Sequence, residues 1–102
     1  MSKELKKNLN ILNRRFYSLQ KKYGVKRMGV FGSFARGDQR KNSDIDILVE
    51  FSKPIGFFEF IDLENHLARA LDRKVDLVTK NALKPAIKDN VLKETIYVKK
   101  EY

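Results

Sequence analysis

Three aspartates and a glycine-serine pair are the residues of this chain whose types and spacing could do chemistry. Gly32 and Ser33 are followed, after ten residues, by Asp44 and Asp46, and Asp76 lies further along the chain. Residues two apart on a strand point to the same face, so Asp44 and Asp46 are expected to lie together. Two carboxylates that close repel each other unless a cation or a proton lies between them. Because Mg²⁺ prefers carboxylate oxygens, the pair predicts a metal site, and the alternative is two side chains facing water at a sheet edge.

The glycine-serine pair has the features of a phosphate-binding turn. Gly32 follows an apolar run that reads as the end of a strand, and glycine allows a sharp turn without a side chain to block a ligand. Ser33 offers a backbone N–H and a hydroxyl, and N–H groups at the start of a short helix hold phosphates. Arg36 adds positive charge nearby. These three residues are the predicted nucleotide-binding set, although a glycine-serine pair after a strand is usually an ordinary turn.

Asp76 is the third acidic candidate, because it interrupts a short apolar strand. Its neighbours Val75 and Leu77 point to the opposite face, where they would pack in a core. An isolated acidic residue of this kind is either solvent-exposed on an edge strand or part of a site. If its strand lies beside the strand of Asp44 and Asp46, the three carboxylates share one face.

The elements that must position these residues follow from hydrophobic periodicity. Apolar residues three or four apart predict a helix that ends near Gly24, and a second helix over residues 57–72. Alternating or short apolar runs predict strands over 26–31, 44–51, 74–79 and 96–98. A short helix is expected over 33–36, and a helical stretch over 83–94 with Pro85 near its start. The expected fold class is α/β, a small mixed sheet with flanking helices.

The motifs resemble those of a known family. The Gly32-Ser33 pair, the ten-residue spacer and the Asp44-x-Asp46 pair match the signature of nucleotidyltransferases of the DNA polymerase beta superfamily. The chain resembles most the minimal nucleotidyltransferases (MNT), which are the antitoxin partners of HEPN toxins. The flanking segments that carry this resemblance are ARGD at residues 35–38 and SDIDILV at residues 43–49. It extends over nearly the whole chain and implies the nucleotidyltransferase, polymerase beta palm-like fold.

The resemblance implies an activity and a set of roles. Asp44, Asp46 and Asp76 would be the catalytic triad and the ligands of two Mg²⁺ ions, which stabilise the attacking and leaving oxygens of an in-line displacement. Asp76 would orient or deprotonate the acceptor hydroxyl. The reaction would transfer AMP from ATP to a hydroxyl of a protein, with a tyrosine of a HEPN toxin as acceptor. The chain would then be an antitoxin that modifies its partner.

Length and composition bound the remaining possibilities. The 102 residues are expected to form one domain over residues 1–102, too small to add a domain for a large substrate. The absence of cysteine excludes disulfides and thiolate metal sites and is consistent with the cytoplasm. No stretch approaches the roughly 18 apolar residues of a membrane span, and the charged amino terminus lacks a signal core. A soluble, cytoplasmic protein with no membrane partner is expected.

The net charge of +9 calls for an anionic partner, such as a polyphosphate, a nucleic acid or an acidic protein. The basic residues look scattered along the sequence rather than gathered in a stripe with aromatics, so most are interpreted as solvated surface. Two alternatives to the enzyme remain. One is an antitoxin that neutralises by binding alone, and the other is a small basic nucleic-acid-binding module, for which no recognised motif is present.

Other conspicuous side chains are interpreted as structural. His66 is the only histidine and has no second histidine for a metal pair. Phe57, Phe58 and Phe60 are expected in the core, with a partner-binding patch as the less favoured alternative.

Overall fold

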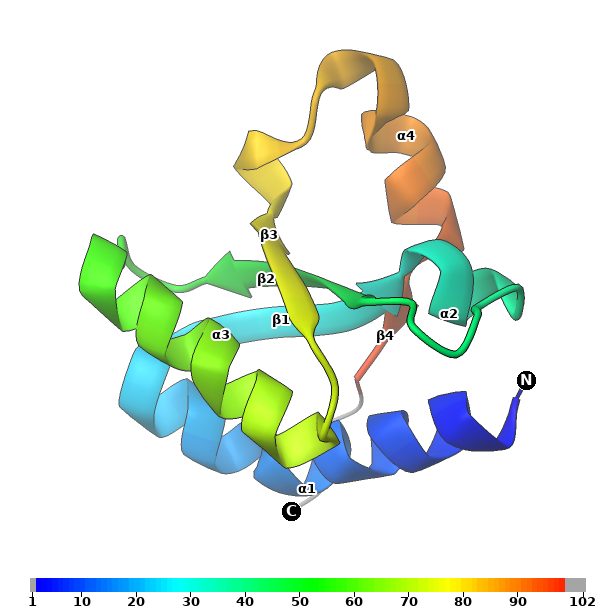
Figure 1. Ribbon diagram of the computed structural model, residues 1–102. Coiled ribbons are helices and arrows are strands. Elements are labelled where there is room, and N and C mark those ends of the chain that lie inside the picture. The colour runs from blue at the N-terminus through cyan, green and yellow to red at the C-terminus, as the bar shows by residue number, and fades with distance from the viewer. Residues whose placement is uncertain (1, 99–102) are drawn as a thin grey trace.

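A four-stranded mixed sheet with helices on both sides forms the architecture of the computed structural model, which describes residues 2–98 (Figure 1). The strand order is β3-β2-β1-β4, with β1 antiparallel to β2 and β4, and β2 parallel to β3. The elements in chain order are α1 (Lys3–Tyr23), β1 (Val25–Phe31), α2 (Gly32–Arg36), β2 (Ile45–Phe51), α3 (Phe57–Leu71), β3 (Val75–Thr79), a 3-10 turn (Lys80–Ala82), α4 (Pro85–Glu94) and β4 (Ile96–Tyr97). The predicted α/β class is confirmed, while residues 1 and 99–102 of the expected domain lie outside the described part.

The long helix α1 begins and ends where the sequence indicates. The Ser2 side chain caps it by accepting a hydrogen bond from the backbone N–H of Leu5 at 3.1 Å. Gly24 ends it in the left-handed conformation, with φ of 73°, which glycine adopts without a steric penalty. Between these ends, the apolar stripe of α1 is buried in the core from Leu5 to Tyr23.

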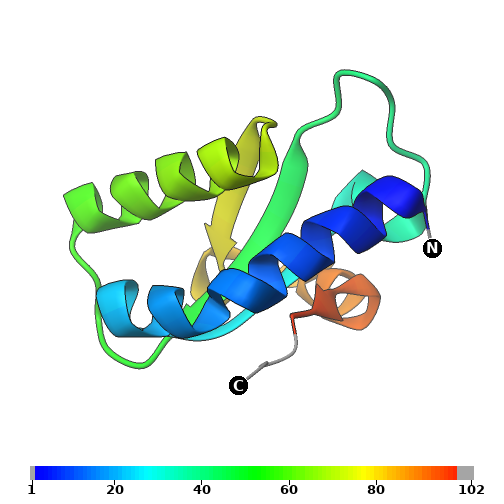
Figure 2. The ribbon, with the colours of Figure 1, turned by 90° about the horizontal axis from the view of Figure 1, so that it is seen from below.

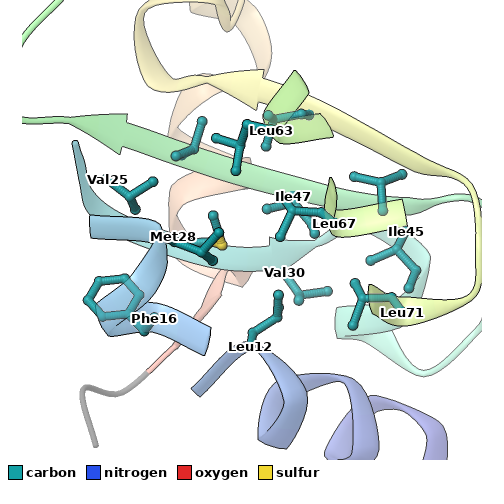
Figure 3. Packing of buried hydrophobic residues seen from close by; sticks show 14 of the residues in the cluster. Leu12, Phe16, Val25, Met28, Val30, Ile45, Ile47, Leu63, Leu67 and Leu71 are labelled. Atoms are coloured by element: carbon teal, nitrogen blue, oxygen red, sulfur yellow. The ribbon is translucent and has the colours of Figure 1, made fainter. Parts of the chain in front are cut away.

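Helices α1 and α3 run side by side across one face of the sheet, as the view from below shows (Figure 2). Their apolar stripes pack on the alternate strand residues Met28, Val30, Ile45 and Ile47, all buried (Figure 3). A smaller cluster of Leu48, Leu83 and Val91 joins α4 to the opposite face. On the α4 side of β2, Leu48 is therefore buried, whereas Asp46 remains partly open.

Several expectations at element ends need correction. Strand β2 begins at Ile45, whose N–H donates to the Lys74 carbonyl at 2.9 Å, so Asp44 lies just outside the ladder. The stretch expected as a helix from residue 83 becomes helical only at Pro85, since the fixed φ of proline suits the first helical position. Part of the chain before it forms the 3-10 turn.

The expectation that the aromatic cluster is buried is wrong for two of its three residues. Phe57 and Phe58 are 72% and 84% exposed, whereas Phe60 packs against the core. The core-facing side of α3 continues from Phe60 through Leu63 and Leu67. Phe58 lies on another side of the helix, and Phe57, although three residues before Phe60, is exposed at the first helical position. His66 is half-buried beside the ring of Tyr23, in agreement with a structural role. Over the described residues, no helix has the length and apolarity needed to cross a membrane.

Candidate active site

Asp46 lies at the centre of a row of predicted site residues that crosses three strands. The antiparallel register pairs Asp46 with Phe31, the residue before Gly32, and the parallel register pairs it with Asp76. Residues directly opposite each other on adjacent strands point to the same face. The sheet therefore brings the glycine turn, Asp46 and Asp76 together, as expected if the third strand lies beside the second.

The turn and the carboxylate are in direct contact. Gly32 has φ of 71°, in the left-handed region, and a β-carbon at this position would overlap Oδ2 of Asp46. Both the conformation and the close approach require glycine. The backbone predicted to bind phosphate, at Gly32, is therefore next to the carboxylate predicted to bind a cation, that of Asp46.

The electrostatics of Asp46 are those of a site rich in negative charge. Its pKa is raised to about 6, chiefly by burial and also by the nearby carboxylates of Asp76, Asp44 and Glu94, while Arg36 opposes the shift. A carboxyl group in this position gains most from a bound cation, which would neutralise the crowded charges.

The other two aspartates are held less tightly. Asp44 Oδ2 lies 3.9 Å from Lys74 Nζ, in a pair whose lysine is 82% exposed, and Asp76 is exposed. Within residues 2–98, no three acidic or histidine side chains converge closely enough to hold a metal ion. The oxygen donors nevertheless fit a hard divalent cation, with Asp46 opposite Asp76 and Asp44 two residues away.

Glu94 is a member of the site that sequence reasoning missed. Its Oε2, at the end of α4, accepts a hydrogen bond from the Gly32 N–H at 2.5 Å and lies 3.2 Å from Arg36 Nη1. Arg36 also donates from Nε to Asp38 Oδ2 at 3.2 Å. An acidic residue at a helix carboxyl end is electrostatically unfavourable, and that was the signal available in the sequence. The Glu94 carboxylate therefore occupies the Gly32 N–H and the Arg36 guanidinium, the two groups that were predicted to bind phosphate.

Arg73 is a second missed residue, and it holds the segment that carries Asp44. Its Nη1 donates to the carbonyls of Lys41 and Ser43, each at 2.9 Å, and its Nη2 lies 2.6 Å from Glu4 Oε1. Five donors in one planar group allow arginine to bind several oxygens at once. Arg73 thereby fixes the end of the spacer just before Asp44.

The Ser33 hydroxyl is half-buried and has no hydrogen-bond partner within residues 2–98, so it is available to a ligand. A hollow of about 510 Å³ lies elsewhere, at the carboxyl ends of β2 and β3, and is lined by residues 49–55 and 79–81. None of the predicted site residues lines it. The carboxylates instead lie at the opposite ends of these strands, accessible from the α4 side of the sheet.

This arrangement can support one kind of chemistry particularly well. Backbone and hydroxyl donors at Gly32 and Ser33, with Arg36 beside them, suit a chain of phosphates. The carboxylates of Asp44, Asp46 and Asp76 suit a divalent cation bound between those phosphates and a second substrate. Attack on a phosphorus atom by an incoming hydroxyl is the reaction that uses both halves.

Comparisons with known proteins agree with this chemistry. Residues 9–98 match the nucleotidyltransferase domain family. The protein adenylyltransferase MntA of Thermococcus cleftensis is 43% identical over 89 residues, which cover 87% of this chain and 90% of that protein. A crystal structure of a toxin-antitoxin with AMP-PNP has 27% sequence identity and a TM-score of 0.73, covering 92% of this chain and 74% of that one.

A more distant solved structure shares the fold. It is the tri-AMPylated HEPN toxin of Shewanella oneidensis in complex with its MNT antitoxin, at 22% identity and a TM-score of 0.66. The alignment covers 95% of this chain and 73% of that chain. At this identity the likeness concerns the arrangement of helices and strands alone.

Proposed function

This chain belongs to the nucleotidyltransferase domain family, and from that premise we propose that it transfers AMP from ATP to a hydroxyl of a protein acceptor. The acceptor is a tyrosine of a HEPN toxin, and the modification makes the chain an antitoxin. The relative named protein adenylyltransferase supports the reaction, and the 27% identical neighbour solved as a toxin-antitoxin with AMP-PNP supports a toxin as the partner and ATP as the donor. Use of ATP as donor favours the cytoplasm as the place of action.

A single observation carries the proposal: Asp46 touches Gly32 on one side and is paired with Asp76 on the other. The donor and acceptor halves of the reaction are thereby adjacent. Gly32, Ser33 and Arg36 bind the β- and γ-phosphates through a backbone N–H, a hydroxyl and a guanidinium. The α-phosphorus then lies near Asp46, and Asp76 faces the incoming hydroxyl.

Asp44, Asp46 and Asp76 are the residues that would hold Mg²⁺. Bound there, the cation would supply charge neutralisation for the phosphates during transfer. A bound cation would hold Asp46, whose pKa is raised to about 6, in its charged form. Asp76 accepts or directs the proton of the acceptor hydroxyl. The hydroxyl oxygen bonds to the α-phosphorus, the bond to the bridging oxygen of the β-phosphate breaks, and pyrophosphate leaves.

The test is AMP transfer to a HEPN toxin co-expressed with this chain. We expect the toxin to gain the mass of one or more AMP units, and Asp44→Asn or Asp46→Asn to abolish the gain because a cation ligand is lost. Asp89→Asn, an equal charge change on the exposed side of α4, is the matched control and should transfer normally.

Two outcomes would contradict the proposal. A toxin that is neutralised with no gain in mass would make the chain an antitoxin by binding alone. Wild-type activity of the variant that carries both asparagines would exclude these carboxylates from the site.

A further inference from the structure

The surface of α1 opposite the core carries a continuous basic stripe. It consists of residues spaced alternately by four and three positions, all exposed: Lys3, Lys7, Asn10, Arg14, Tyr17 and Lys21. This spacing keeps side chains on one side of a helix. At 1.5 Å per residue the stripe is about 27 Å long. The impression from the sequence that the basic residues are scattered is therefore wrong for this helix.

The charge of the stripe is not compensated. Among the described residues, none of its lysines or its arginine takes part in an ion pair. The one acidic residue of α1, Glu4, is turned toward Arg73. The flanking Lys6 and Arg15 add two more exposed positive groups. Binding of a linear, negatively charged partner would relieve the repulsion within such a row of like charges and would therefore be favourable.

The stripe also includes a hollow and an exposed aromatic ring. A hollow of about 450 Å³ is lined by its residues from Lys3 to Arg14 together with Lys6 and Ile11. Further along, Tyr17 is 53% exposed, and Lys21 Nζ lies 5.2 Å from the centre of its ring. An exposed ring within a basic row gives a base a surface on which to stack, while neighbouring cations hold the phosphates.

We propose that the basic stripe of α1 binds the backbone of a single-stranded nucleic acid, with a base stacked on Tyr17. The stripe lies on the side of α1 away from the core, and α1 and α4 lie on opposite faces of the sheet (Figure 2). Asp46 is two residues before Leu48 on β2 and shares its face, and Leu48 packs with Val91 of α4. This interaction is thus separate from AMP transfer and does not depend on it. A single strand fits better than an acidic protein surface, because it supplies regular negative charge and unpaired bases together.

Fluorescence anisotropy with a labelled oligothymidylate tests the proposal over a series of salt concentrations. Lys7→Glu combined with Arg14→Glu should weaken binding at least about tenfold and reduce the salt slope by about 1.4, as expected for two lost phosphate contacts. Tyr17→Ser should weaken binding about fivefold and leave the salt slope unchanged, because it removes stacking alone.

The matched control is Lys53→Glu combined with Lys84→Glu, which changes net charge equally at two exposed sites outside α1. This variant should keep the wild-type salt slope, and thermal melts establish that every variant is folded. Equal losses in the stripe variant and the control would overturn the proposal, because binding would then follow net charge alone. Oligoglutamate that binds as tightly as oligothymidylate, with no effect of Tyr17→Ser, would overturn it in favour of an acidic protein partner.

Discussion

Removing the carboxylate of Glu94 should tighten the binding of nucleoside triphosphate. In the free protein this carboxylate accepts the Gly32 N–H at 2.5 Å and lies 3.2 Å from Arg36 Nη1. A triphosphate that uses the same donor and the same guanidinium must first displace it. Glu94 therefore acts as an internal competitor, and its removal lowers the free energy required for binding.

The size of the effect follows from these contacts. A hydrogen bond to a charged group contributes about 1.5–3 kcal/mol, whereas one between neutral groups contributes about 0.5–1.5 kcal/mol. The ion pair of Glu94 with Arg36 is open to solvent and adds little. Glu94→Gln keeps an acceptor for Gly32 but loses the charge, a change of about 1 kcal/mol, which corresponds to roughly fivefold tighter binding. Glu94→Ala also removes the acceptor, and we expect about tenfold tighter binding.

Isothermal titration calorimetry with Mg²⁺ and a non-hydrolysable ATP analogue measures the effect directly. Asp89→Asn on the same helix is the control for a general loss of negative charge and should bind as the wild type does. If Glu94→Ala binds the analogue no more tightly than the wild type, the phosphates do not compete for the Gly32 N–H, and the predicted role of this turn is wrong.

Three further predictions concern the carboxylates and their support. Asp76→Asn should retain affinity for Mg²⁺ and ATP while the transfer rate falls about 10²–10⁴-fold, because proton transfer from the acceptor is impaired; wild-type transfer would remove Asp76 from the site. Arg73→Lys replaces two donor nitrogens, Nη1 on the Lys41 and Ser43 carbonyls and Nη2 on Glu4, with one ammonium that cannot occupy both positions. Thermal melts and transfer assays should therefore show about 1–3 kcal/mol lower stability and slower transfer, and unchanged values would exclude a positioning role. The pKa of Asp46 is 3.8 in the unfolded chain and about 6 in the folded protein, so between these pH values the folded protein binds more protons. The free energy of unfolding therefore decreases as the pH rises from about 4 to about 6. Denaturant unfolding without Mg²⁺ should show Asp46→Asn about 1 kcal/mol more stable near pH 7, a value reduced for partial exposure, and no advantage near pH 4.

Local patterns were sufficient to predict the elements and part of the site. The glycine at position 32, the spacer and the aspartates at 44 and 46 lie within one short stretch, so their chemistry could be interpreted without knowledge of the fold. The bounds of α1 and α3 follow from apolar periodicity and end signals, which are properties of neighbouring residues. The exposure of Phe57 and Phe58 was not predicted, because periodicity does not tell whether the first turn of a helix is covered by the rest of the protein.

Other features depend on contacts between distant residues. Asp76 lies opposite Asp46 only because β3 pairs in parallel with β2, and a shift of register by one residue would turn its side chain to the other face. Glu94 reaches the Gly32 N–H across 62 positions in the sequence, and Arg73 supports a segment 30 residues before it.

The sequence by itself determined which residues could bind phosphate and metal, because residue type and short spacing define that chemistry. Only the tertiary structure decided which carboxylates meet, which donors are already satisfied and which basic residues share a surface. The physical reason is that strand pairing and helix packing are chosen by burial of the whole apolar core. The positions of the polar side chains relative to one another are then set by that packing.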